Sequence, residues 1–150
     1  MRTRRDEAIE LFRKRFNCSQ AVFTAYRQRE FLDEATALRL ATVFGAGVAC
    51  TGNELCGAVS GALMALSMKH GRGDEQSVEA KAKTYALAQD FLQRFGGRFG
   101  GCRCEQVLGF NLGTPEGLKR AQDEKLFETR CLDAVKAAAE ILDEMLPEEL

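Results

Sequence analysis

NELCGAVSGALMALSMKHG, residues 53–71, is the stretch of sequence that decides how this chain folds. It reads as one apolar helix that opens near Cys56, and the positions that follow are unusually rich in small residues: Gly57, Ala58, Gly61, Ala62 and Ala65. Small residues fill little space, but they allow a second backbone to approach closely. The basic pair Lys69 and His70, followed by Gly71, is typical of a helix end. We therefore expect a central helix here, with another segment of chain packed close to the thiol at its start.

Helical patterns continue on both sides of this stretch. Apolar residues recur at helical spacing over residues 4–16, and Asn17 then predicts the cap of a second helix that runs to about Phe31. Asp33 is the expected cap of a third helix, and a long helix with one apolar face covers roughly residues 75–95. The fold class that we predict is all-α, a compact bundle of five to seven helices with glycine-rich loops.

Two glycine-rich segments separate these helices, and no segment reads as a strand. The first, GAGVACTGN at residues 45–53, lacks the Lys-Ser/Thr ending of a phosphate-binding loop, and no strand precedes it. We therefore expect tight turns at its glycines, and Asn53 as the cap of the helix that holds Cys56. The second segment lies at residues 96–101. Valine, isoleucine and threonine never alternate along the chain in the pattern of a strand, so we expect no sheet.

Length and charge bound the class of protein. The 150 residues are expected to form a single domain, residues 1–150, large enough to bury a core. The net charge of −1 gives no field that would attract nucleic acid, so we expect no nucleic-acid partner. The longest apolar run, residues 55–68, is shorter than the roughly 20 residues that cross a bilayer. We expect no membrane insertion and, without the apolar core of a signal peptide at the amino terminus, a cytoplasmic location.

Six cysteines are many for a chain of this length: Cys18, Cys50, Cys56, Cys102, Cys104 and Cys131. In the cytoplasm thiols are kept reduced, so this number favours a metal, a cluster or redox chemistry over a disulfide framework. The alternative is structural, because a free cysteine behaves as a small hydrophobic residue and is often buried in a core. That reading suits any one of the six better than it suits all of them together.

Four of the cysteines share one local position, the start of a predicted helix. Cys18 follows the cap Asn17, Cys56 follows Asn53, and the other two are Cys104 and Cys131. Free N–H groups and the positive end of the helix dipole favour a thiolate there, and the thiolate is both the nucleophile and the metal ligand. If these helix starts meet in space, they form one site with four thiolates.

The remaining two cysteines are harder to place. Cys102 and Cys104 form a Cys-x-Cys pair, and two such neighbours cannot both point into one site from a regular helix, so we favour Cys104 and treat Cys102 as accessory. Cys50, in the glycine-rich loop, is either a resolving partner of Cys56 or an exposed loop thiol. No local CxxC metal motif is present, and the only histidine, His70, lies too far along its helix to pair with Cys56.

The segments around the four cysteines resemble a known family. NCSQAV around Cys18, CGAVSGALM from Cys56, CEQVLG from Cys104, and then GTPEGL and LFETRC ending at Cys131 are similar, in that order, to the C_GCAxxG_C_C family of redox-active proteins. The resemblance covers about residues 7–146. It implies that these four cysteines are the ones that define the family, and that Cys50 and Cys102 fall outside the pattern.

The chain is also similar to part of the split-Soret cytochromes, which carry an iron–sulfur cluster besides haem. This chain has no CxxCH haem-attachment motif, so the resemblance implies only the cluster. It also favours a homodimer, in which the helix at 75–95 or the small-residue face at 57–65 would contact the second subunit. A redox partner protein is the other partner that a redox function implies.

Three functions stay open at this point. The first is electron transfer by an iron–sulfur cluster, or by another soft metal such as zinc, bound to Cys18, Cys56, Cys104 and Cys131. The second is thiol–disulfide chemistry with Cys18 and Cys56 as the reactive pair. The third is a helical structural or partner-binding domain whose thiols are part of the core.

Overall fold

The computed structural model describes residues 1–148 of the chain and is all-helical over that range. It contains eight α-helices and one short 3₁₀ helix: α1 (Arg4–Arg13), α2 (Cys18–Tyr26), α3 (Glu34–Ala41), η1 (Thr42–Phe44), α4 (Gly57–His70), α5 (Val78–Phe99), α6 (Cys104–Leu108), α7 (Pro115–Asp123) and α8 (Arg130–Met145). The predicted class is confirmed, and no strand occurs among these residues. The predicted number of five to seven is too low, because short segments such as α6, of five residues, form separate helices.

Several helix starts follow the predicted caps. The Asn17 side chain accepts a hydrogen bond from the backbone N–H of Gln20 at 2.9 Å, and the Gln20 side chain accepts one from the backbone N–H of Asn17. This reciprocal pair fixes the first turn of α2 and hence the position of Cys18. Thr114 caps α7 through the backbone N–H of Gly117, and Pro115 occupies the first helical position.

Two helix ends differ from the prediction. Helix α2 stops at Tyr26 rather than near Phe31, which is exposed in the following loop. Helix α5 continues through the glycines of the expected loop and ends at Phe99, before Gly100 in a left-handed conformation. The rings of Phe91, Phe95 and Phe99 contact one another along this helix, which explains why packing carries the helix past the glycines: Phe91–Phe95 at 6.0 Å and Phe95–Phe99 at 4.7 Å between centroids.

The start of α4 also differs. Asn53 does not cap the helix, because residues 54–56 run alongside residues 102–104 instead. The backbone N–H of Cys56 donates to the carbonyl of Cys102 at 2.8 Å, and the N–H of Cys104 donates to the carbonyl of Glu54 at 2.8 Å. Cys56 is therefore the residue just before the helix, and this short pairing holds the segments that carry Cys56 and Cys104 together.

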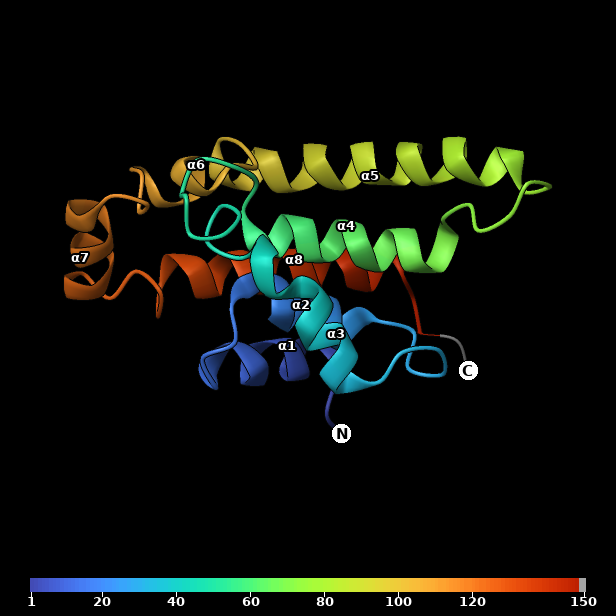
Figure 1. The fold of residues 1–150 in the computed structure, drawn as a ribbon, viewed down its shortest axis with the longest axis horizontal. Helices are drawn as coiled ribbons and strands as arrows, with labels where there is room; N and C mark the ends of the chain where they lie inside the picture. Colours follow the sequence, from blue (N-terminus) through green and yellow to red (C-terminus); the bar gives the residue numbers. More distant parts are fainter. Residues whose placement is uncertain (149–150) are drawn as a thin grey trace.

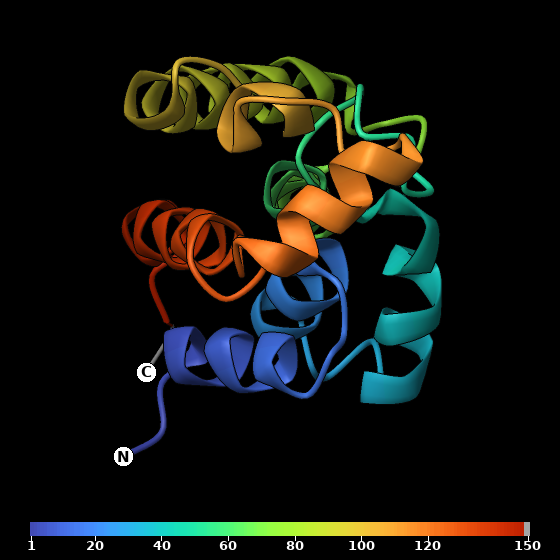
Figure 2. The same cartoon turned by 90° about the vertical axis from the view of Figure 1, so that its left-hand side faces the viewer.

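The helices form three tiers around α4. Figure 1 shows α5 along the top, α4 and α8 side by side in the middle, and α1, α2 and α3 below. Helix α4 contacts α2, α5 and α8, and its early residues are almost all buried. Figure 2, seen along the bundle, shows α7 crossing one end of these tiers. The starts of α4, α6 and α8 all lie at this end.

The small residues of α4 face α2. A side chain at Gly57 would collide with the Cys18 sulfur and lie 2.9 Å from the backbone nitrogen of Ser19, and one at Gly61 would lie 2.7 Å from the carbonyl oxygen of Ser19. The two helices therefore approach so closely that only glycine fits at both positions. This face is covered within the chain, so the suggestion that residues 57–65 contact a second subunit is wrong.

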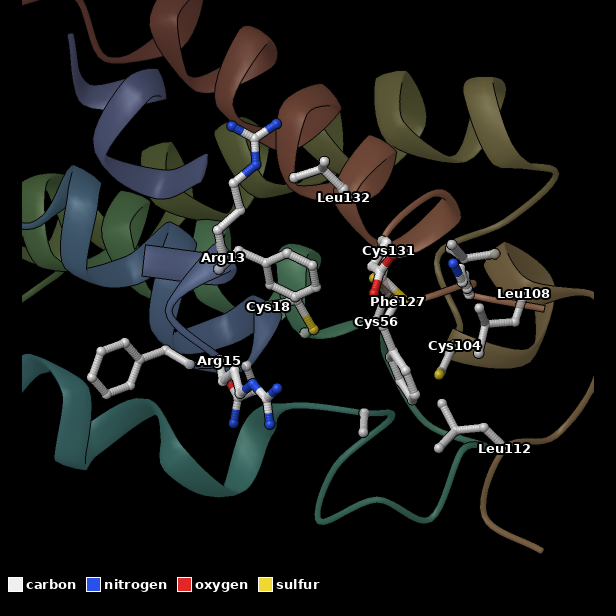
Figure 3. A pocket seen from close by; sticks show the side chains of 18 of the residues that line it. Arg13, Arg15, Cys18, Cys56, Cys104, Leu108, Leu112, Phe127, Cys131 and Leu132 are labelled. Carbon is white, nitrogen blue, oxygen red and sulfur yellow. The ribbon is translucent and has the colours of Figure 1, made fainter. Parts of the chain in front are cut away.

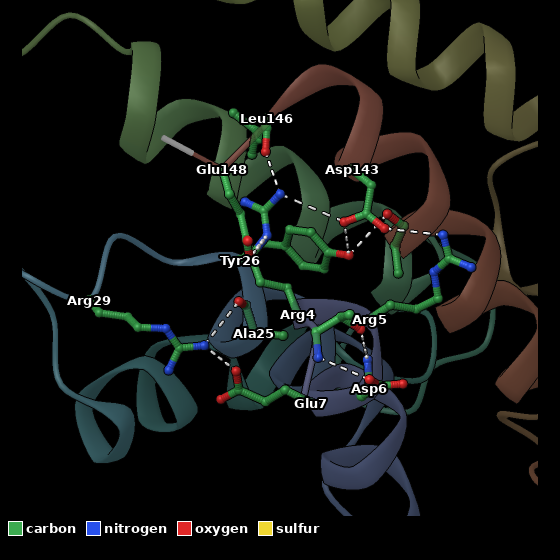
Figure 4. A network of polar contacts seen from close by, with 12 residues as sticks. Arg4, Arg5, Asp6, Glu7, Ala25, Tyr26, Arg29, Asp143, Leu146 and Glu148 are labelled. Carbon is green, nitrogen blue, oxygen red and sulfur yellow. Dashed lines mark hydrogen bonds and ion pairs between the residues drawn. The ribbon is translucent and has the colours of Figure 1, made fainter. Parts of the chain in front are cut away.

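A polar network closes the opposite end of the bundle (Figure 4). The Tyr26 hydroxyl donates to the Asp143 carboxylate at 2.8 Å and lies 3.0 Å from the carbonyl oxygen of Ala139. Arg4 stacks over the Tyr26 ring and contacts both Asp143 and the carbonyl of Leu146. These contacts join α1, α2 and α8. No helix in residues 1–148 is long and apolar enough to cross a membrane.

Candidate functional site

Four of the six cysteines line one cavity of about 910 Å³ at the end of the bundle near α7. They are the four that the sequence singles out, Cys18, Cys56, Cys104 and Cys131, and Figure 3 shows them around this space with Phe127 between them. The rest of the lining is largely apolar, with side chains that include Phe12, Val107, Leu108, Leu112 and Leu132. The four helix starts that carry these cysteines therefore border one cavity.

Cys18 and Cys56 are held against each other by the contact between α2 and α4. Cys18 is the first residue of α2, and its sulfur lies against the Cα of Gly57, the residue after Cys56. Any side chain at Gly57 would occupy the position of that sulfur. The glycine after Cys56 thus allows the two thiols to lie side by side. This close contact explains why small residues follow Cys56 in the sequence.

The pKa values of the two thiols of this pair are shifted in opposite directions. The Cys56 thiol, as a hydrogen-bond donor, and the backbone N–H groups of Ala46, Ser19 and Cys18 itself lower the pKa of Cys18 to about 6, despite its burial. Cys56 in turn keeps its proton, because the Cys18 sulfur accepts it and because burial disfavours a second charge, and both effects raise the pKa of Cys56. At neutral pH the pair therefore holds one thiolate and one thiol.

Cys104 and Cys131, on the other side of the cavity, are not thiolates at neutral pH. Burial, together with the nearby Cys18 and Cys50 sulfurs, raises the pKa of Cys104 to about 12. Burial and the sulfurs of Cys18 and Cys104 also raise the pKa of Cys131. The expectation that all four helix starts stabilise thiolates is wrong for these residues, because burial outweighs the helix end at both.

The glycine-rich loop before α4 is an unusual turn. Five consecutive residues, 46–50, have positive φ, and only Gly47 among them is glycine. A side chain at Gly47 would lie 2.8 Å from the Cβ of Cys104, so the turn passes directly beneath that cysteine. The same turn directs the N–H of Ala46 at Cys18. Turns near the site were expected, but a left-handed run through alanine and valine was not, because these residues rarely adopt it.

The two accessory cysteines lie outside the cavity. Cys50 is exposed on the left-handed turn, and Cys102 is half-buried with its thiol donating to the carbonyl of Leu92 at 3.3 Å. Burial raises the pKa of Cys102. The structure therefore separates Cys102 from Cys104, as the Cys-x-Cys spacing suggested.

The four cavity cysteines suit some bound groups better than others. All six cysteines are free thiols, and within residues 1–148 no three Cys, His, Asp or Glu side chains stand close enough to hold a single metal ion. In a multi-iron cluster the cysteine ligands bind different iron atoms, so their sulfurs stand farther apart than the ligands of one ion. The four thiols have the donor chemistry for such a cluster and the cavity has the room for it, and the hydrogen-bonded Cys18 and Cys56 would have to separate to bind different iron atoms.

Several residues of the cavity were not foreseen from the sequence. Arg13 is the last residue of α1 and Arg15 follows that helix, and Lys125 and Phe127 lie in the connection between α7 and α8. Nothing in the local sequence distinguishes them from other surface arginines and lysines. Lys125 and Phe127 lie at the cavity because α7 crosses the end of the bundle, and that is a tertiary feature.

A comparison with known protein families identifies a family that covers most of the chain. The model of the family described as "Putative redox-active protein (C_GCAxxG_C_C)" matches residues 16–145, which include all four cavity cysteines. Neither the curated proteins nor the solved structures contain a significant match to this chain.

Proposed function

The chain belongs to the C_GCAxxG_C_C family, and from that premise we propose that it is an electron-transfer protein whose four cavity cysteines bind an iron–sulfur cluster. Such a cluster supplies one-electron transfer at a potential set by its surroundings. Cys18, Cys56, Cys104 and Cys131 would be its ligands. Cys50 and Cys102, outside the cavity, would not take part.

One observation carries this proposal: four thiols from four different helix starts meet at the wall of one cavity. Packing alone can bury a cysteine, but it gives no reason for four of them to line the same space. The chain has a single histidine, at the other end of α4, so the site offers no imidazole ligand beside its four sulfurs. Soft thiolate ligands of this kind are typical of iron–sulfur clusters.

The residues around the thiols are arranged to receive such a group. Cys18 is already a thiolate at neutral pH, so it is the first ligand available. Cys56, Cys104 and Cys131 hold their protons and must release them on binding, which makes loading favour higher pH. The apolar side chains of the lining limit the access of water to the sulfurs.

The test is to purify the protein without oxygen and measure iron, acid-labile sulfide and zinc together with the visible spectrum. We expect iron and sulfide in stoichiometric amounts, and their loss when Cys18, Cys56, Cys104 or Cys131 is replaced by Ala. Cys50→Ala and Cys102→Ala are the matched controls and should keep the full content. Colourless wild-type protein without iron, in which all six thiols react, would contradict the proposal, and stoichiometric zinc would indicate a different soft metal.

A second function is favoured by the contact between Cys18 and Cys56. A thiolate beside a protonated thiol is the arrangement that exchanges disulfides. The Cys18 thiolate would attack a low-molecular-weight disulfide and release one thiolate from it. Cys56 would then lose its proton and attack the mixed disulfide, which releases the second thiolate and leaves a Cys18–Cys56 disulfide. The small disulfide gains the two electrons that the two cysteines lose.

This second function is tested on iron-free protein with oxidised glutathione. If it is right, mass spectrometry finds one internal disulfide between Cys18 and Cys56, and Cys56→Ala stops at the mixed disulfide on Cys18. The absence of both products would exclude it. If the protein also contains no iron, the remaining reading is a helical structural or partner-binding domain with buried thiols.

A further inference from the structure

Three cations line the mouth of the four-cysteine cavity: Arg13, Arg15 and Lys125. All three are exposed, and only one acidic residue, Glu128, belongs to the same lining. The protein as a whole has a net charge of −1. The cavity therefore has an excess of positive charge although the chain as a whole is slightly negative. A local excess of this kind attracts anions.

The protein itself does not use these charges. In the part of the chain that the structure describes, none of the three side chains has a hydrogen bond or an ion pair. Other arginines at the surface are paired, such as Arg94 with Asp90 and Glu144. The Cys18 thiolate takes its stabilisation chiefly from the Cys56 thiol and backbone N–H groups rather than from these cations. Their charge remains available to a molecule in the mouth.

Two of the three cations are held in a backbone conformation that side chains rarely adopt. Arg15 has a φ of 76° and Lys125 a φ of 57°. They come from distant parts of the chain, after α1 and after α7, yet both line the same cavity. Unusual backbone of this kind gathers at functional sites.

Between the cations and the thiols the cavity is apolar. Phe12, Phe16 and Phe127 line it together with leucines 108, 112 and 132. Figure 3 shows Arg13 and Arg15 on one side of the cavity, with the Arg13 guanidinium directed away from the cysteines, and Phe127 near Cys56 and Cys131 in this view. A volume of about 910 Å³ is that of a small-molecule pocket and leaves room beside the sulfurs.

We propose that the mouth of this cavity binds a small organic anion, attracted by the combined positive charge of Arg13, Arg15 and Lys125 and with its apolar body against the phenylalanines. Such a molecule would lie next to the cysteines, so it is the class of substrate or electron carrier that the site would serve. This last step rests on the proposed redox function. The binding itself does not, and it can be measured without any cluster.

The probe is 1-anilinonaphthalene-8-sulfonate, which joins an aromatic body to one negative charge, and its neutral counterpart is N-phenyl-1-naphthylamine. We expect saturable fluorescence enhancement with the sulfonate at one site per chain. The triple variant Arg13→Gln, Arg15→Gln, Lys125→Gln should weaken sulfonate binding about tenfold, and binding of the neutral probe by less than about twofold. The matched control, Lys81→Gln, Lys83→Gln, Lys136→Gln, removes the same charge outside the cavity and should leave both affinities unchanged.

Alkylation supplies a second measurement at the thiols. In reduced, iron-free protein, the rate of Cys18 alkylation by anionic iodoacetate relative to neutral iodoacetamide should fall severalfold in the cavity triple variant. The same ratio at Cys50, outside the cavity, should not change. Iron content is measured on the same variants, so a protein without a cluster but with charge-dependent binding would overturn the proposed function and keep this inference.

The inference is overturned by any of three results: no saturable binding of the sulfonate, equal weakening by the control triple variant, or an unchanged alkylation ratio at Cys18. The first would show that the mouth does not hold an aromatic anion, and the second that only the overall charge matters. The third would show that the cations do not act on molecules that reach the thiols.

Discussion

The two sides of the four-cysteine cavity both carry cysteines at helix starts, but the pKa values of these cysteines are shifted in opposite directions. On one side, Cys18 lies at the start of a well-capped helix and has its pKa lowered to about 6. On the other, Cys104 lies at the start of α6 and Cys131 in the first turn of α8, and the pKa of each is raised. A helix start is therefore not sufficient to make a thiolate.

What differs is the number of donors that reach each sulfur. Cys18 has the Cys56 thiol and backbone N–H groups from two segments, including Ala46 of the left-handed turn. Burial dominates at Cys104 and Cys131, and the neighbouring sulfurs add to it. The comparison indicates that the contacts from Cys56 and Ala46, added to the N–H groups of the helix start, decide which thiol is charged.

The largest expected effect comes from a side chain at Gly57, where α2 and α4 approach closely and place Cys18 beside Cys56. Gly57→Ala places a methyl group at the position of the Cys18 sulfur and against the backbone of Ser19. Backbone cannot move aside as a flexible side chain can, so we expect a loss of about 3 kcal/mol in the free energy of unfolding. Urea denaturation of the reduced protein measures it.

Gly97→Ala is the matched control for this substitution. Gly97 also lies inside a helix, but a side chain there would meet nothing within 4 Å. Alanine is the better helix former, so we expect a gain of about 1 kcal/mol. A similar loss in both variants would mean that close packing at Gly57 is not what positions Cys18.

The next largest effect is expected when the Cys56 thiol, the main hydrogen-bond donor to Cys18, is removed. Cys56→Ala takes away the thiol that chiefly lowers the pKa of Cys18. A hydrogen bond to a charged group contributes about 1.5–3 kcal/mol, so the pKa of Cys18 should rise by about one to two units. The rate of iodoacetamide reaction at Cys18 against pH measures it.

Cys102→Ala is the control here, because Cys102 is not in the cavity and its thiol donates to Leu92. Its pH profile at Cys18 should match that of the wild type. An unchanged profile in Cys56→Ala would show that the backbone N–H groups alone make the thiolate.

Much of this fold could be read from the sequence, because the local signals agree with the tertiary structure. Asn17 and Asp33 are strong start signals, and both helices begin where they indicate. The predicted cap at Asn53 failed because pairing between residues 54–56 and 102–104 overrides it. That pairing joins residues almost fifty positions apart, and no local pattern encodes it.

The cysteines of the cavity could be predicted from the sequence, but their pKa values and the cations beside them could not. Cysteines at helix starts, with the family resemblance, identify the four residues that line the cavity. The pKa of Cys18 depends on the N–H of Ala46, which lies in a turn of positive φ. Alanine and valine rarely adopt positive φ, so the sequence does not predict this turn. The cation Lys125 joins the site through the position of α7, which it follows in the chain.

The contrast between the two sides also predicts how stability changes with pH. The pKa of Cys18 is lower in the folded protein, about 6 against an ordinary 9.0, so its thiolate stabilises the fold at high pH, and this contribution is lost as the pH falls through 6. Between pH 7 and 8.5, the difference in the free energy of unfolding between wild type and Cys18→Ser should grow by about 1.4 kcal/mol per pH unit.

Cys104 should behave in the opposite sense, because its pKa is raised to about 12 in the folded protein. Its neutral thiol stabilises the fold below about pH 9, and this contribution is lost as the pH rises toward 12. Between pH 9.5 and 10.5 the wild type should therefore lose stability relative to Cys104→Ser. Urea denaturation under reducing conditions at each pH measures both trends, and parallel curves for either variant would contradict the assigned charge states.

The smallest expected effect concerns the left-handed turn whose Ala46 N–H donates to the Cys18 sulfur. Ala49 is exposed in this turn with a φ of 53°, a conformation that costs a residue with a side chain about 1–2 kcal/mol. Ala49→Gly removes that cost but adds freedom to the unfolded chain, so we expect a net gain below about 1 kcal/mol in urea denaturation. The pKa of Cys18 should stay near 6, because the N–H of Ala49 still donates to Val43 and holds the turn. A raised pKa in this variant would mean that the strained alanine itself directs the Ala46 donor at the sulfur, and the difference between the two sides would then depend on the conformation of a single loop.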